Sequence, residues 1–315
     1  MKKSYLNYVV GGALFLSAPM LTSCQDILGE WDKPTPANTD AGGGGSTEGV
    51  AYKSWVSGST FDDKTATTYT KVTSSTTTWS EGTYVVDDDI TIAGGVSVTG
   101  DVNLILCDGK KLTVNGNIAD GSATPTYSLS IYAQSEGTGE LEVNTTANEY
   151  SFRFKGLSIN GGTVTASNTE GTVGQVLFVS DNLNIYGGKV NATSTSGVAI
   201  MLDEAALKIY NASVTANGAT GISNWGTGGI NSIYSGSVTA TGTTAGIATG
   251  FNFYGGSITA TGTTEGMTGT VYNASENTIT YDTYDGTNWT TNVGTNAAGT
   301  LLDVDALDVK GVKIY

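Results

Sequence analysis

Apolar residues recur at every second position in five successive segments of the chain. Four of the five segments start with two apolar residues two positions apart, and the fourth has Asn in the first of these positions. Each then passes through a small pair such as Gly-Gly and ends with Val or Ile followed two positions later by Ala. The five copies begin at Leu157, Leu183, Leu207, Asn231 and Phe251. A period of two is typical of β-strands, so each copy predicts two short strands joined at a corner.

A third apolar segment precedes four of these copies, at residues 152–154, 176–179, 199–202 and, more weakly, 221–225. Three short strands per repeat predict a three-sided coil in which each strand pairs with its counterpart in the next copy. No window has the three-and-four spacing of an amphipathic helix. A β-propeller blade requires about 40 residues and four strands, more than these copies contain.

The residue that follows the second apolar position recurs once in each repeat, so it can be used to count the coils. It holds, in order, Tyr132, Asn160, Tyr186, Tyr210, Tyr234, Tyr254 and Tyr272, and the spacing shortens from 28 to 18 residues. We therefore predict an all-β, three-sided parallel β-helix of about eight coils over residues 85–300. Residues 51–84 are predicted to form an N-terminal cap, and residues 301–315 a C-terminal strand or a lateral cover, because solenoid ends expose strand edges.

The N-terminus has the pattern of a lipoprotein signal peptide. Lys2 and Lys3 precede an apolar stretch over residues 5–21, which ends in Leu-Thr-Ser before Cys24. This pattern predicts cleavage after residue 23, a lipid anchor on Cys24 and a flexible tether over residues 24–50, which contains four consecutive glycines. The alternative is an ordinary secretory signal, with Cys24 in the mature chain by chance.

The amino-acid composition excludes several catalytic mechanisms and binding partners. The chain has no histidine, which excludes Ser-His-Asp and Cys-His mechanisms and the usual imidazole zinc site. It has 14 Lys and Arg residues against 29 Asp and Glu, a net charge of -15. Nucleic acid is therefore excluded as a partner, and contact with the membrane is expected through the lipid on Cys24 rather than through the protein surface.

The tyrosine register predicts a binding surface. If the apolar pairs point inward, alternation places Tyr186, Tyr210, Tyr234 and Tyr254 in a column along one corner of the coil. Rings in a row present apolar faces for the C–H groups of sugars and hydroxyl groups for hydrogen bonds. The alternative is a stack that only stabilises the fold.

A second candidate surface lies on the strand before each repeat. Arg153 and Lys155 alternate with Phe152 and Phe154, so we expect the two cations to point outward. In the following coils we assign Leu177, Val179 and Met201 to outward positions, with Trp225 nearby. Such an apolar strip beside two cations suits an acidic polysaccharide or a partner protein. The alternative is that a long loop or residues 301–314 cover it.

The repeats resemble the right-handed parallel β-helices of the pectate-lyase-like superfold, in particular a subgroup of carbohydrate-binding surface lipoproteins. The matching stretches begin at Gly100 and Leu129 and continue through the Gly-Gly-x-Val-x-Ala copies, covering about residues 80–280. The resemblance implies a right-handed coil and a cell-surface role with polysaccharide or host-glycan binding. The acidic residues after Cys24 resemble those of lipoproteins exported to the outer face of the outer membrane; a periplasmic location stays open.

Relatives in this superfold bind calcium through aspartates and abstract a proton with Arg or Lys. By this resemblance, Asp181, Asp203 and Glu204, which precede strands of successive coils, are candidate calcium ligands. The lyase pattern of clustered aspartates with a catalytic arginine is not visible. We expect a non-enzymatic glycan-binding or adhesive surface protein without a required cofactor. The alternatives are a polysaccharide lyase or hydrolase, and a structural or partner-binding surface protein with no sugar ligand.

Overall fold

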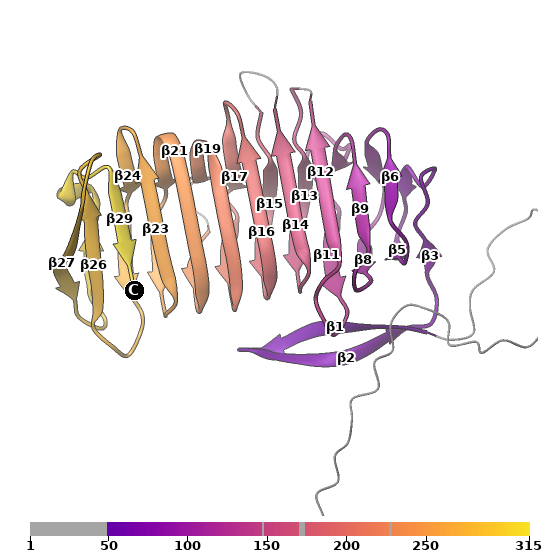
Figure 1. Cartoon of the computed structure of the whole chain (residues 1–315), viewed down its shortest axis with the longest axis horizontal. Coiled ribbons are helices and arrows are strands. Elements are labelled where there is room, and N and C mark those ends of the chain that lie inside the picture. The colour runs from indigo at the N-terminus through magenta and orange to yellow at the C-terminus, as the bar shows by residue number, and fades with distance from the viewer. Residues whose placement is uncertain (1–48, 147, 170–173, 227–228) are drawn as a thin grey trace, which may run out of the picture.

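The chain folds into a three-sided parallel β-helix of about eight turns (Figure 1). The structure is a computed structural model that describes residues 49–146, 148–169, 174–226 and 229–315. Apart from the 3-10 turn η1 (Asp305–Leu307), the regular elements in these ranges are all strands. The predicted fold class is confirmed.

Each coil contributes one strand to each of three faces, which the chain visits in the order A, B, C. Face A contains β5 (Gly82–Val86), β8 (Val102–Leu106), β11 (Ser128–Ala133), the second halves of β13 (Phe152–Ile159) and β15 (Leu177–Ile185), β18 (Ala206–Ile209), β20 (Ser232–Ile233), β22 (Phe251–Phe253) and β25 (Thr270–Asn273).

Face B contains β6 (Ile90–Ile92), β9 (Lys111–Val114), β12 (Glu140–Thr145), β14 (Thr163–Asn168), β16 (Gly188–Ser194), the first halves of β19 (Ala212–Trp225) and β21 (Gly236–Ala248), and β23 (Ser257–Gly262). Face C contains β7 (Val96–Val98), β10 (Ile118–Asp120), the first halves of β13 and β15, β17 (Val198–Asp203), the second halves of β19 and β21, and β24 (Glu265–Thr268).

The interior consists of apolar columns that run along the axis. Ile159, Ile185, Ile209 and Ile233 are paired in register on face A and are fully buried. On face C, Phe152 and Phe154 point inward as predicted, and both are fully buried. The recurrent apolar pairs therefore form continuous inner columns, which is the arrangement that the sequence predicts.

Residues 51–84 form two separate features at the N-terminal end. The hairpin of β1 (Val50–Ser57) and β2 (Thr60–Ala66) lies along the side of the β-helix, with Lys53 of β1 opposite Ala133 of β11 (Figure 1). The strands β3 (Thr70–Lys71) and β4 (Thr78–Trp79) pair with β5 and β7 and begin an incomplete first coil. Trp79 is fully buried and closes this end of the core. Of the two features, the second lies at the end of the coils and the hairpin lies along their side.

Antiparallel strands close the C-terminal end. On face A, β28 (Leu301–Asp303) pairs with β25. On face B, β29 (Gly311–Ile314) pairs with β23, followed by β26 (Ile279–Tyr284) and β27 (Trp289–Asn296). The coils end with β25 rather than at residue 300, and β29 is an end strand rather than a lateral cover. No helix in the described ranges is long and apolar enough to cross a membrane.

Candidate functional site

The predicted tyrosine column exists. The ring centroids are 5.5 Å apart between Tyr186 and Tyr210, 4.4 Å between Tyr210 and Tyr234, and 4.5 Å between Tyr234 and Tyr254. The corresponding interplanar angles are 28°, 2° and 12°. The rings are therefore stacked face to face along the axis, so that each inner ring face is covered by its neighbour.

The hairpin packs against the N-terminal part of this column, where the ring of Trp55 contacts both Tyr186 and Tyr210, with the Tyr210 centroid 4.9 Å away. The indole ring of Trp55 stacks on Tyr186, with centroids 4.1 Å apart, and its backbone N–H donates to Oδ1 of Asn160, the preceding residue of the column, at 3.1 Å. One coil earlier, Tyr52 packs edge-on against Tyr132. The column therefore docks the hairpin, a role that the sequence did not reveal.

At the other end the column stops one coil earlier than predicted. Tyr272 is opposite Asn252, which places it outside the column, and the residue that follows the inward Phe253 column is Ala274. Tyr254 thus has no aromatic neighbour on its C-terminal side, and its side chain is 41% exposed. Of the four predicted ligand-binding tyrosines, Tyr254 is the exposed one, and the other three are half-buried.

The stack has a pH signature. Burial, together with the neighbouring phenol of Tyr234, raises the pKa of Tyr210 to about 12. An unfolded tyrosine ionises near pH 10, so the unfolded chain loses this proton first. Stability is therefore expected to fall as pH rises from about 10 to 12. The test is to titrate phenolate absorbance in the wild type and in Tyr210→Phe and to subtract the second curve from the first. The difference should have a midpoint near pH 12, and a midpoint near 10 would contradict the stacked environment.

The guanidinium of Arg153 is engaged in the fold. Its guanidinium donates from Nη1 to the carbonyl oxygen of Asp120 at 3.0 Å and from Nη2 to that of Ala123 at 2.6 Å. It also lies 5.7 Å from the ring of Tyr150 and 5.9 Å from that of Phe178. Arg153 therefore ties down the loop after β10, and its ligand-binding role stays a prediction.

The same loop is fixed from inside by Asp120. Burial alone raises the pKa of this carboxyl group, but hydrogen bonds from Ser122, Thr126 and Tyr127 outweigh it and hold the pKa well below its usual range. Asp120 is therefore an ionised structural group rather than a candidate acid catalyst.

Two of the three residues predicted for the apolar strip on face C were assigned one position out of register, whereas Met201 lies in the outward column as predicted. Leu177 and Val179 pair with Phe152 and Phe154 and are fully buried inside the coil. The outward column instead contains Arg153, Phe178 and Met201. Tyr150 packs on Phe178 at 4.9 Å, and Met201 is buried. A loop covers this strip, which was one of our two alternatives, and residues 301–314 do not.

One hollow brings together four of the predicted site residues. Lys155, Asp181, Asp203 and Glu204 line a hollow of about 540 Å³ at the corner between faces C and A, together with Thr124, Pro125 and Ser180. The three carboxylates and Lys155 are exposed. Glu204 has a φ of 57°, a left-handed conformation that is uncommon for a residue other than glycine.

The backbone of Trp225 lies beside that of two residues that line this hollow. Trp225 is opposite Asp203 on the neighbouring strand, and its carbonyl oxygen accepts the backbone N–H of Glu204 at 2.7 Å. Its side chain is 56% exposed. Sequence analysis placed Lys155 and Trp225 in one candidate site and the carboxylates in another, whereas the structure gathers them at one corner.

The carboxylates do not form a metal-binding group. In the described ranges, no three Asp, Glu, Cys or His residues are arranged so that they could hold a metal ion. Asp181, Asp203 and Glu204 line the hollow without converging on one point. Their role as calcium ligands stays a prediction that the side-chain geometry does not support. Cys24, the predicted lipidation site, lies outside the described residues.

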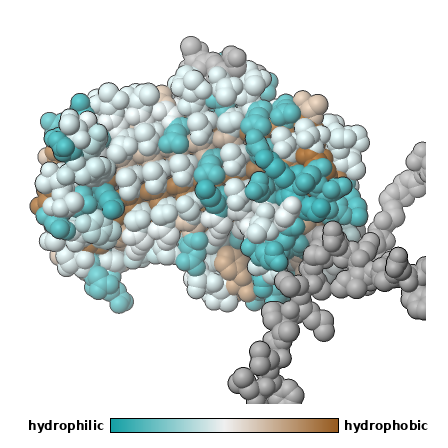
Figure 2. Space-filling model, in the orientation of Figure 1, coloured by the Kyte–Doolittle hydropathy of each residue, from teal (hydrophilic) through white to brown (hydrophobic). Residues whose placement is uncertain are grey.

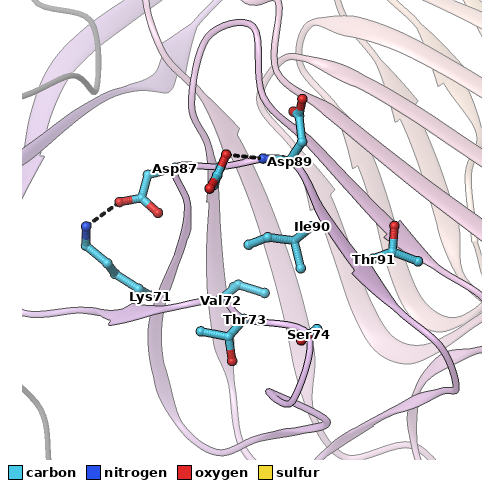
Figure 3. A pocket seen from close by; sticks show the side chains of 9 residues that line it. Lys71, Val72, Thr73, Ser74, Asp87, Asp89, Ile90 and Thr91 are labelled. Atoms are coloured by element: carbon cyan, nitrogen blue, oxygen red, sulfur yellow. Dashed lines mark hydrogen bonds and ion pairs between the residues drawn. The ribbon is translucent and has the colours of Figure 1, made fainter.

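A second hollow and a polar network lie near the N-terminal end. The hollow, of about 370 Å³, is lined by residues 71–74 and 87–91, with an ion pair of 2.5 Å between Lys71 and Asp87 (Figure 3).

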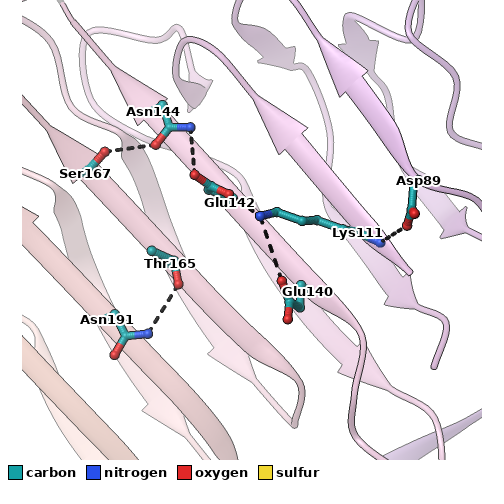
Figure 4. A network of polar contacts seen from close by, with 8 residues as sticks. All are labelled: Asp89, Lys111, Glu140, Glu142, Asn144, Thr165, Ser167 and Asn191. Carbon is teal, nitrogen blue, oxygen red and sulfur yellow. Dashed lines mark hydrogen bonds and ion pairs between the residues drawn. The ribbon is translucent and has the colours of Figure 1, made fainter. Parts of the chain in front are cut away.

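On face B, Lys111 pairs with Glu142, which raises the pKa of the lysine and lowers that of the glutamate (Figure 4). The most hydrophilic surface gathers toward this end of the visible face, and a paler surface follows along the axis (Figure 2).

Comparison with known proteins adds no assignment: no protein-family model, no curated protein and no solved structure matches this chain. The resemblance to pectate-lyase-like proteins therefore stays a prediction from the sequence motifs.

Proposed function

We propose that this chain is a non-enzymatic glycan-binding protein, displayed at the outer surface of the outer membrane by a lipid on Cys24. The observation that carries the proposal is the hollow lined by Lys155, Asp181, Asp203 and Glu204, with the exposed side chain of Trp225 on the strand beside that of Asp203. An indole face packs against sugar C–H groups, while carboxylates accept hydrogen bonds from hydroxyl groups and an ammonium group donates them.

The rigid frame supports this role. The residues around the hollow come from successive coils whose strands are paired in register, so they keep a fixed spacing without a ligand. A preformed site loses little conformational entropy on binding. In contrast, the tyrosine column has most of its ring faces covered, and Tyr254 is the exposed one of its four rings. We therefore assign sugar binding to the hollow ahead of the column.

A non-enzymatic role agrees with the charged groups. The pKa values of Asp120, Glu142 and Asp285 are all lowered, so none of these carboxyl groups is held as an acid near neutral pH. Arg153, the only arginine in the chain, is engaged with backbone carbonyls. These groups therefore supply no proton donor near neutral pH of the kind that a hydrolase requires.

The test is a screen of the full chain against a polysaccharide panel, with and without calcium. We expect at least one glycan to bind, and Trp225→Ala to weaken its binding at least tenfold through loss of the stacking surface. Trp289→Ala is the matched control, because Trp289 is a comparably exposed tryptophan, 40% exposed, on β27 away from the hollow. Absence of binding to the whole panel, or equal loss in both variants, would refute the assignment. Binding only with calcium would return Asp181, Asp203 and Glu204 to the role of ligands.

A further inference from the structure

Face B continues as one sheet from one end of the molecule to the other. Its strands follow in the order β6, β9, β12, β14, β16, β19, β21, β23, β29, β26 and β27. Within the described ranges β6 pairs only with β9, and β27 pairs only with β26. The sheet therefore has two open edges, one at each end of the β-helix.

The backbone groups at both open edges can be identified. The carbonyl of Ile92 accepts the N–H of Asn115, the residue that follows β9, so by alternation the N–H and C=O of Thr91 point away from β9. At the other end, Thr280 exchanges both of its backbone hydrogen bonds with Tyr315, and Thr295 lies opposite Thr280 on β27. The N–H and C=O of Thr295 therefore point away from β26, to the open edge.

The two ends have complementary shapes. At the N-terminal end, β3 and β4 add strands to faces A and C beyond β5 and β7, while residues 72–77 cross between them. Face B has no strand at this level, and the hollow lined by Lys71 and Thr91 lies there (Figure 3). At the C-terminal end, β29, β26 and β27 extend face B beyond β23, whereas face C ends at β24 (Figure 1). One end is recessed where the other protrudes.

The protruding strand lacks two of the usual protections of an edge and has a third, a β-bulge, in only part of its length. Residues 289–296 contain no charged residue and no proline, the features that normally block edge pairing. A bulge around Asn292, which has a φ of 52°, leaves Gly294, Thr295 and Asn296 as the regular stretch. This stretch has the same length as β6, which is three residues long. Thr295 and Thr91 are the central residues of the two stretches, and both are exposed.

We propose that copies of this chain associate head to tail, with β27 of one copy pairing with β6 of the next. β29 is antiparallel to β23, β26 is antiparallel to β29, and β27 is antiparallel to β26. When the axes of two copies are aligned, β27 therefore runs antiparallel to β6, and Thr295 and Thr91 exchange N–H···O=C hydrogen bonds. A head-to-tail contact does not close on itself, so it generates filaments. Because the paired stretch is short, the assembly depends on concentration.

The test uses the full chain in detergent and measures mass against concentration by analytical ultracentrifugation. We expect the mean mass of the wild type to rise with concentration. Thr91→Pro and Thr295→Pro each remove one outward N–H without touching a hydrogen bond to β9 or β26, so each variant alone should stay at the monomer mass. An equimolar mixture of the two retains one intact interface and should give a one-to-one dimer that does not grow.

The matched controls are Thr91→Val and Thr295→Val, which keep the backbone N–H and should assemble like the wild type. Circular dichroism verifies the fold of each variant, and Thr91→Lys and Thr295→Lys replace any proline variant whose spectrum changes. A wild type that is monomeric at every concentration would overturn the proposal. So would proline variants that assemble normally, or a Thr91→Pro variant that still dimerises, because that result indicates symmetric pairing of two β27 strands.

Discussion

Replacement of Phe154 by alanine is expected to lower the free energy of unfolding by about 3–5 kcal/mol. Phe154 is fully buried on face C and is aligned with Val179 and Leu202 of the next two coils. Its removal leaves a cavity, because strands held in register on both sides cannot move inward to fill it. Urea unfolding followed by circular dichroism measures the loss.

Thr239→Ala is the matched control for this variant. Thr239 is an exposed, outward-facing residue of β21, so its truncation leaves the interior intact. We expect a change within about 1 kcal/mol, which is the range of strand propensities. A loss of less than 1 kcal/mol for Phe154→Ala would mean that the interior is not packed as described.

The inner columns could be predicted from the sequence because the signal is repeated in every coil. Leu183 and Ile185 alternate with polar residues, and the same pattern recurs at Leu207 and Ile209. Alternation distinguishes the inner from the outer side only when the outer residues are polar. Around Phe178 the run Val-Leu-Phe-Val is apolar throughout, because Tyr150 covers the outer residue. The register of that strand was therefore ambiguous, and our assignment of Leu177 and Val179 was wrong.

The sequence predicted that the tyrosines lie in one column, but not that their rings stack on one another. Strands of successive coils lie about 4.8 Å apart, which is close to the stacking distance of aromatic rings. Tyrosines at the same position therefore cover one another instead of offering their faces. Trp55 was missed because it is 131 residues from Tyr186, its stacking partner, and no repeat links the hairpin to the coils.

The hollow was predicted only in part. Its three carboxylates are in successive coils and could be aligned from the sequence. Their proximity to Lys155 and Trp225 depends on how sharply each corner turns between faces C and A. Corner geometry is set by backbone conformations such as the positive φ of Glu204, for which the sequence carries no clear signal.

The second prediction concerns a glycine at the corner between faces A and B. Gly256 has a φ of 89°, and a Cβ atom there would lie 2.4 Å from the carbonyl oxygen of Gly236 in the preceding coil. We expect Gly256→Ala to lower the free energy of unfolding by at least about 2 kcal/mol, from backbone strain together with the clash. Gly121→Ala is the control, because it has open space around the added methyl group.

One coil of this chain turns the same corner without a glycine at this position. In the column of Gly256, one coil has Ala212, and there the preceding Asn211 takes the positive φ, at 40°. Asparagine tolerates this conformation, which moves the turn by one residue. The double variant Gly255→Asn with Gly256→Ala should therefore recover part of the stability lost in Gly256→Ala. If the double variant is less stable than the single one, the corner depends on glycine for close packing of the coils rather than for its backbone conformation.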